Sequence, residues 1–200
     1  MKRLLPLFFL IAMAVSAQEA ETRSKTGLRF DPGYRVGWSQ PIATGTTVLS
    51  EGYKPGWGVN FELDLFSYRN WMLGVGSTFA GFNVTDRQVV GTFSNALYSS
   101  LYGAVSYRYA FTERWSLIPS ISAGAASFDM TGSQNLKISS QKGQEYRIGS
   151  TLNYRFGHHT AAYVGLFYAR THVGMNTTPE FEDFYSNLSQ VQLQVGIYFH

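Results

Sequence analysis

The stretch QVQLQVGIYF, residues 190–199, alternates polar and apolar side chains along its whole length. Its apolar positions are Val191, Leu193, Val195, Ile197 and Phe199. Successive side chains of a β-strand point to opposite faces, so this segment predicts a strand with one apolar face and one polar face. Half-buried strands of soluble proteins have the same period. The stretch alone therefore fits a soluble sandwich or a membrane barrel, and the remaining sequence must distinguish the two.

Other segments follow the two-residue period to different degrees. It is clear in GWGVNFELDLF (56–66), WMLGVGSTF (71–79), LYGAVSYRY (101–109) and EYRIGSTLNYRF (145–156). It is weaker in WSLIPSISAGA (115–125), where Pro119 interrupts the strand pattern. The segment AAYVGLFYAR (161–170) has bulky groups on both faces, so the sequence does not assign its facing. We predict eight strands, over residues 28–39, 56–66, 71–83, 97–110, 115–128, 144–156, 161–171 and 188–199.

The links between these strands alternate in length. The short links are residues 67–70, 112–114 and 157–160, and the long polar links are residues 40–55, 84–96, 129–143 and 172–187. A soluble sandwich has no reason to place every short link at one end. Barrels of outer membranes do, because their periplasmic turns are short and their extracellular loops are long. The pattern predicts an all-β fold, an eight-stranded antiparallel up-and-down transmembrane barrel with both termini in the periplasm.

The two faces of the strands favour the same architecture. The apolar face carries large rings, at Trp57, Phe61, Trp71, Phe79, Tyr107, Trp115, Tyr154 and Phe156. These rings exceed what the interior of an eight-stranded barrel admits, so this face must point outward, into lipid. The other face is rich in Gly, Ser and Thr, which suit a narrow interior. Several of the aromatic residues lie beside the short turns, where they predict an interfacial girdle.

Composition and the first residues agree with a secreted membrane protein. Charged residues make up only 14% of the chain, against about 25% in typical soluble domains. There is no cysteine, which excludes disulfides, thiolate metal sites and thiol nucleophiles. Residues 1–17 have the basic start, short apolar run and small final residues of a cleaved signal peptide, leaving residues 18–200 as the barrel domain. Its removal lowers the formal net charge from +3 to +1, so nucleic acid is not an expected partner.

The signal peptide, eight strands, alternating links and terminal QVGIYF together resemble the small outer-membrane barrels of the OmpA/OmpX type in Gram-negative bacteria. In that family's assembly signal, a near-terminal glycine precedes alternating hydrophobic residues and a final Phe. Gly196 and Phe199 match it, and His200 departs from it by following the Phe. The resemblance implies a monomer in the cell outer membrane that contacts outer-membrane lipids, lipopolysaccharide and the barrel-assembly machinery. The sequence contains no family-specific functional motif.

Charged residues on the small-residue face are the first candidate site. The predicted facing points seven of them into the lumen: Arg35, Glu62, Asp64, Arg108, Glu145, Arg147 and Arg155. Eight strands leave room only for side chains, so we expect a salt-bridged network that plugs the lumen rather than an ion path. Asp64, Arg108 and Arg155 all lie near a short turn, and we expect Asp64 to pair with one of the two arginines.

The last long link is the second candidate site. The segment TTPEFEDFYSN (177–187) carries acidic and aromatic residues, at Glu180, Phe181, Glu182, Asp183, Phe184 and Tyr185. They predict either a solvated loop with rings packed on the barrel rim or a surface that binds an extracellular protein or other surface partner.

The histidines give no catalytic or metal site by their spacing, so no cofactor is expected. Only His172 lies at the depth that lipid chemistry in the outer leaflet would need, and no nucleophile is evident beside it. We favour a non-enzymatic structural or surface-interaction role. Two alternatives stay open: a lipid A-modifying enzyme of the deacylase or acyltransferase type, by fold analogy, and a narrow small-solute channel.

Overall fold

The computed structural model describes residues 27–132, 137–174 and 178–200. The predicted signal peptide, residues 1–17, lies outside the described residues, as do parts of the third and fourth long links. Over the described ranges the strands are β1 (Arg29–Ala43), β2 (Tyr53–Tyr68), β3 (Trp71–Val84), β4 (Phe93–Tyr107), β5 (Tyr109–Ala110), β6 (Trp115–Gly132), β7 (Lys137–Arg155), β8 (Thr160–Val173) and β9 (Asn187–Phe199). The helices are α2 (Val48–Gly52), α3 (Arg87–Val90) and α4 (Pro179–Ser186). None of these helices is long and apolar enough to cross a membrane.

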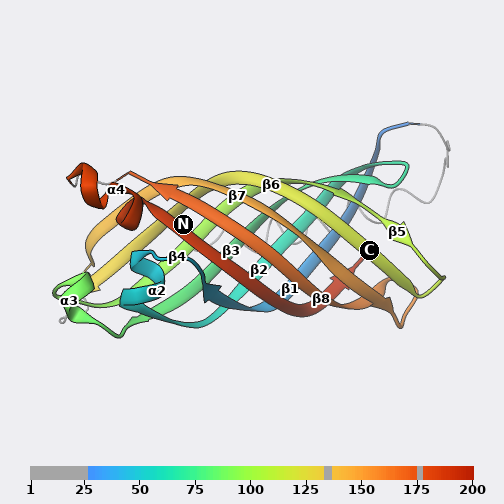
Figure 1. Ribbon diagram of the computed structural model, residues 1–200. Helices are drawn as coiled ribbons and strands as arrows, with labels where there is room; N and C mark the ends of the chain where they lie inside the picture. Colours follow the sequence, from blue (N-terminus) through green and yellow to red (C-terminus); the bar gives the residue numbers. More distant parts are fainter. Residues whose placement is uncertain (1–26, 133–136, 175–177) are drawn as a thin grey trace, which may run out of the picture.

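The strands form one closed antiparallel sheet (Figure 1). Each long strand pairs with its neighbours in the chain, and two further ladders complete the circle, β1 with β9 and β4 with β6. The closing ladder runs from Tyr34 opposite Phe199 to Ala43 opposite Gln190. The predicted eight-stranded barrel is confirmed, because the two-residue β5 only extends the ladder along β6. Strands are longer than predicted at the end with the long links, where β7 begins at Lys137 rather than at residue 144.

The two ends of the barrel differ (Figure 1). The "turn end" holds the links between β2 and β3, β5 and β6, and β7 and β8. The "loop end" holds α2, α3 and α4, which gather there in Figure 1. The link between β2 and β3 is only Arg69 and Asn70, and Arg69 adopts φ 55°, as two-residue hairpin turns require. Thus the predicted short links lie together at one end of the barrel, and the described parts of the long links lie at the other end.

The outer wall is apolar, as the predicted facing requires. At the turn end, aromatic side chains pair across neighbouring strands: Trp71 lies 5.0 Å from Tyr107, measured between ring centroids, and Trp115 lies 4.8 Å from Tyr154. Such cross-strand pairs stabilise the sheet where an interfacial girdle belongs. Pro119 is exposed on this wall. It lies where β6 changes its partner strand from β4 to β5, so the ladder is already interrupted there. Because proline has no backbone N–H, this is the position where it disturbs the hydrogen bonding of the sheet least.

The structure settles the facing of β8, which the sequence left unassigned. Tyr163 and Phe167 are buried inside the barrel, while Val164, Leu166 and Tyr168 are exposed on the outer wall. Glycine makes room for some of these inner rings. A Cβ at Gly37 would collide with the Tyr163 hydroxyl, and one at Gly76 would collide with the ring of Tyr102. Small residues on the inner face therefore allow other strands to place large side chains there.

Candidate functional site

The turn-side half of the interior contains an ion-paired group centred on Arg35. Arg35 on β1 lies opposite Glu62 on β2, and Asp64 points inward two residues further along. The Arg35 guanidinium donates to Glu62, and also to Asp64 through Nη2, 3.1 Å from Oδ2, and Nη1, 3.4 Å from Oδ1. Arg35 and Asp64 are each 3% exposed. A buried carboxylate and guanidinium in this geometry satisfy each other's charge and hydrogen bonds.

Tyr198 on β9 extends this group across the barrel. Its hydroxyl donates to Asp64 Oδ2 at 3.0 Å and accepts from Arg108 Nη2 at 2.7 Å. Its ring lies under Arg35, with 4.5 Å from the guanidinium carbon to the ring centroid. We call these residues, Arg35, Glu62, Asp64, Arg108 and Tyr198, the charged network. Tyr198 is not among the predicted lumen residues, although it shares the inward face of its strand with the glutamines at 190, 192 and 194.

The expected pairing of Asp64 with Arg108 or Arg155 is wrong. Asp64 pairs with Arg35, and only the Tyr198 hydroxyl connects it to Arg108. Arg155 is exposed, because it is the last residue of β7 and lies at the open turn end rather than inside the barrel. The period of alternation assigned the inward faces of Arg35 and Asp64 correctly, but it carries no information on how far each strand is displaced along the barrel.

Arg147 forms a second buried centre nearer the middle of the interior. It is 4% exposed and donates to Thr78 at 2.9 Å and to Gln192 at 2.7 Å. Its guanidinium carbon lies 4.4 Å from the centroid of the Tyr102 ring. Arg147 is therefore held mainly by neutral hydrogen-bond acceptors and an aromatic face.

Glu145 is a fully buried carboxyl group with few polar contacts among the described residues. It is 0% exposed, and its Oε1 lies 3.9 Å from Arg147 Nε. Neither of its carboxylate oxygens accepts a hydrogen bond within the described part of the chain. Of the seven predicted lumen residues, Arg35, Glu62, Asp64 and Arg108 thus come together, Arg147 and Glu145 form a separate pair, and Arg155 stands apart.

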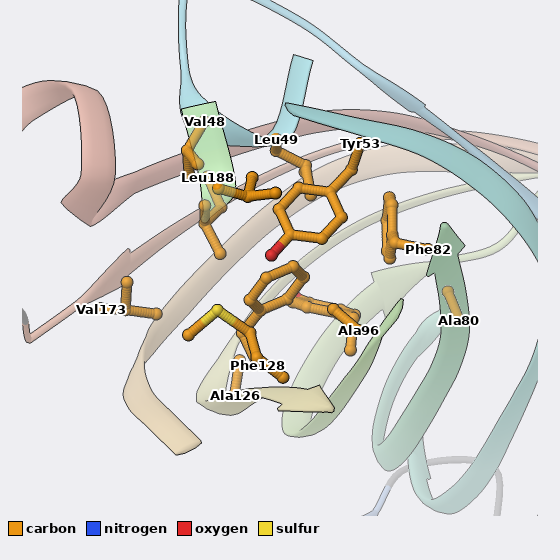
Figure 2. Packing of buried hydrophobic residues seen from close by; sticks show 13 residues of the cluster. Val48, Leu49, Tyr53, Ala80, Phe82, Ala96, Ala126, Phe128, Val173 and Leu188 are labelled. Atoms are coloured by element: carbon orange, nitrogen blue, oxygen red, sulfur yellow. The ribbon is translucent and has the colours of Figure 1, made fainter. Parts of the chain in front are cut away.

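The loop-side half of the interior is apolar, which the sequence did not predict. Figure 2 shows Tyr53, Phe82 and Phe128 packed together, with ring centroids 5.3 Å apart for Tyr53 and Phe128. We call this the apolar cluster, comprising Val48, Leu49, Tyr53, Ala80, Phe82, Val90, Ala96, Tyr98, Ala126, Phe128, Met130, Val173 and Leu188. The helix α2 contributes Val48 and Leu49 from a segment that the sequence predicted as a polar loop. The interior therefore has a charged layer and an apolar layer rather than polar contents throughout.

The helix α4 divides the second candidate site into two faces. Phe184 and Tyr185 are half-buried and pack against the apolar cluster, and the Tyr185 hydroxyl donates to the carbonyl of Val89 at 3.3 Å. The other face is solvent-exposed and carries Glu180, Phe181, Glu182 and Asp183. Packing of rings on the barrel rim is thus seen for Phe184 and Tyr185, while binding of a partner by the exposed face stays a prediction.

A basic group lies on the outer wall near the loop end, which sequence analysis did not identify. Arg170 on β8 lies opposite Tyr146 on β7, and His172 lies opposite Gln144, with Lys142 further along the same strand. Arg170, His172 and Lys142 are all exposed on the outside of the barrel. We call these three residues the wall patch.

Within the wall patch, His172 and Arg170 contact the same side chain, Asn187. The Nδ1 of His172 is 3.3 Å from Asn187 Oδ1, the same oxygen to which Arg170 donates at 3.4 Å. No serine or carboxylate hydrogen-bonds to His172 in the part of the chain that the structure describes, and no group of three or more described His, Cys, Asp or Glu residues is arranged to hold a metal. The described contact of this histidine is one between surface side chains.

Comparison with known proteins gives one family. Residues 6–199 match the model of the outer membrane protein beta-barrel domain, and no curated protein matches the chain. Neisserial surface protein A is 10% identical, with 86% of this chain and 98% of that chain covered and a TM-score of 0.65. AlkL, determined in DMPC bilayers, is 16% identical over 90% of this chain and 93% of that chain, with a TM-score of 0.54. OprG from Pseudomonas aeruginosa is 10% identical over 88% and 98%, with a TM-score of 0.51. At these identities the likeness to solved structures shows the fold alone.

The match to the family model, by contrast, covers almost the whole chain. The chain belongs to the outer membrane protein beta-barrel domain family and is a protein of the outer membrane.

Proposed function

We propose that this protein is a non-enzymatic barrel with a structural or surface-interaction role, and that its lumen is closed. The observation that carries the proposal is the filling of the interior at two levels. The Arg35–Asp64 pair occupies the turn-side half, and Leu49 and Phe128 are each 1% exposed in the loop-side half. An interior of eight strands is only wide enough for its own side chains, which supports closure over conduction.

Conductance tests this proposal directly. The purified protein in planar lipid bilayers should show no stable conductance, because ions would have to displace both the charged network and the apolar cluster. A detergent extract from cells lacking the protein is the control for contaminating porins. Steady channels of one size that appear only with the protein would support the small-solute channel instead.

The exposed face of α4 is the proposed contact surface. Three carboxylates, Glu180, Glu182 and Asp183, surround Phe181, whose side chain is 53% exposed. Such a face suits a partner with a basic, partly apolar surface, because the carboxylates steer the approach and the ring supplies buried area. Packing of Phe184 against the barrel supports a rigid presentation of this face.

Outer-membrane lipids and lipopolysaccharide are the second class of partner that we propose. The wall patch lies beyond the lipid-facing Leu166 and Tyr168 along β8, at the level where phosphate groups of the outer leaflet are expected. Basic side chains near a membrane surface attract anionic headgroups, and Tyr146 beside them is an interfacial residue type.

The enzyme alternative is tested by lipid A mass spectrometry. We expect the same lipid A species in cells with and without the protein, and no change with His172→Ala. A species that appears with the protein and disappears with His172→Ala would establish the enzyme.

We also propose, from the sequence, that residues 1–17 are a cleaved signal peptide, that the barrel-assembly machinery inserts the chain by its last strand, and that the barrel is a monomer.

A further inference from the structure

The turn end of the barrel contains a small cavity that borders the charged network and that the proposed surface role does not explain. Its volume is about 60 Å³. About 10–15 Å³ measured in this way holds one water molecule, so the cavity accepts a group of a few heavy atoms. Its walls come from Arg108, from the turn-side ends of β5, β6, β7, β8 and β9, and from the links between β5 and β6 and between β7 and β8. We call it the turn-end cavity.

Arginines dominate the charge of the turn-end cavity. Arg108, Arg114 and Arg155 all line it, and none of the three forms an ion pair within the described residues. Glu113 is the acidic residue of its lining. Asp31 lies near the same end, but its carboxylate already accepts from Ser67 at 2.9 Å and contacts His200 at 3.3 Å. The cavity therefore has an excess of positive charge.

A buried amide without partners faces this charge. Asn153 lines the turn-end cavity and is 2% exposed, yet neither its Nδ2 nor its Oδ1 forms a hydrogen bond within the described part of the chain. Buried amides are nearly always hydrogen-bonded. The unsatisfied Asn153 donor and acceptor therefore call for a ligand that both accepts and donates. The Tyr198 hydroxyl and His159 add further polar groups to the lining.

We propose that the turn-end cavity binds a phosphate group, either inorganic phosphate or a phosphate monoester. The guanidinium groups of Arg108 and Arg155 match the charge and geometry of phosphate oxygens. A singly protonated phosphate also carries a P–OH, which donates to Asn153 Oδ1 while a P–O⁻ accepts from Nδ2. A carboxylate or a lipid phosphodiester lacks this donor. The barrel thus holds an anion site at the end opposite its proposed contact surface.

Trp115 provides the readout, since it also lines the cavity. We would replace Trp38, Trp57 and Trp71 with Phe, all on the exposed outer wall, and place the protein in phosphatidylcholine nanodiscs. Sodium phosphate is then titrated against sodium chloride and sodium sulfate at equal ionic strength, because screening alone changes surface electrostatics. We expect a saturable change in Trp115 fluorescence with phosphate and none with chloride.

Variants localise the site. Arg155→Gln and Asn153→Leu should each weaken phosphate binding about tenfold or more, since each removes hydrogen bonds to a charged ligand. Arg29→Gln is the matched control, an exposed arginine at the same end that does not line the cavity, and its affinity should equal that of the parent. A difference in gel migration between boiled and unboiled samples verifies that each variant is folded. Because the Arg155 side chain is exposed, we expect Arg155→Gln to fold.

Three results would overturn the proposal. One is the absence of a saturable response to phosphate in folded parent protein. Another is an equal response from Arg155→Gln and Asn153→Leu. The third is a response to nanodiscs containing phosphatidylglycerol with none to free phosphate, which would identify the arginines as anchors for lipid headgroups.

Discussion

Tyr198 on β9 donates a hydrogen bond of 3.0 Å to Asp64 on β2 across the interior, although β1 lies between these strands in the sheet. This contact therefore connects strands that share no ladder. It also brings Arg108, which lies between β4 and β5, into the same group, through the 2.7 Å bond to the Tyr198 hydroxyl. The charged network thus links separate parts of the wall from within.

Removing the Tyr198 hydroxyl should destabilise the barrel. Tyr198→Phe leaves Asp64 with one partner fewer and Arg108 without its hydroxyl acceptor, so we expect a loss of about 1–3 kcal/mol in the free energy of unfolding. Urea unfolding in detergent micelles measures it. Tyr34→Phe is the control, because the Tyr34 ring is 52% exposed on the outer wall, and it should change little. Equal effects of the two changes would contradict a structural role for the Tyr198 hydroxyl.

The ion pairs around Arg35 should be strongly coupled. Arg35→Met strands two buried carboxylates and should cost about 3–5 kcal/mol. Replacing the whole group, as Arg35→Met with Glu62→Gln and Asp64→Asn, should cost much less, since no buried charge is left without a partner. The same urea experiment gives the coupling free energy. If the triple variant loses the sum of the single losses, the three groups do not act together.

The apolar cluster should contribute most of the stability of the loop end. Phe128→Ala empties a site that is 1% exposed and should cost about 3–5 kcal/mol in unfolding free energy. Phe181→Ala, on the 53% exposed face of α4, should leave stability unchanged. The second variant should instead weaken capture of a basic surface partner in a pull-down from surface-exposed proteins. A large loss of stability in Phe181→Ala would mean that α4 packs differently on the barrel.

The loop end should face the exterior of the cell. A protease-cleavable tag inserted beside Glu182 should be cut in intact cells, whereas the same tag between Arg69 and Asn70 should be cut only after the outer membrane is permeabilised. Immunoblotting of the tagged protein measures both. The reverse pattern would invert the orientation and place the proposed contact surface in the periplasm.

The wall patch should bind anionic lipid. Lys142→Gln combined with Arg170→Gln should reduce the affinity of the detergent-solubilised protein for lipopolysaccharide, measured by surface plasmon resonance at low and high salt. Lys54→Gln removes another exposed loop-end cation outside the patch and is the control. Equal loss in both would show that total charge, rather than the wall patch, determines binding.

The sequence predicts the barrel and the direction of its side chains well, because both follow from a period of two residues and from link lengths. It fails where the answer depends on register. The faces of Arg35, Asp64 and Arg108 are correct, but the partner of Asp64 depends on the alignment of β1, β2 and β9, which no local pattern encodes. Pairs between strands distant in the sequence are therefore the part that required the structure.

The apolar cluster was missed for a different reason. Val48 and Leu49 occupy a polar, glycine-rich stretch that reads as a loop, and only the turn of α2 points both into the barrel mouth. A five-residue helix is too short to show a helical period. The wall patch was missed because Lys142 and Arg170 come to the same part of the wall only through the pairing of β7 with β8.

The ladder between β1 and β9 couples closure of the barrel to burial of its interior charges. Tyr198 and Gln192, the partners of Asp64 and Arg147, both belong to β9, the strand that closes the sheet against β1. Until β9 pairs with β1, the carboxylate and the guanidinium lack these contacts and are best kept hydrated. Closing the wall and removing water from its interior are consequently one step.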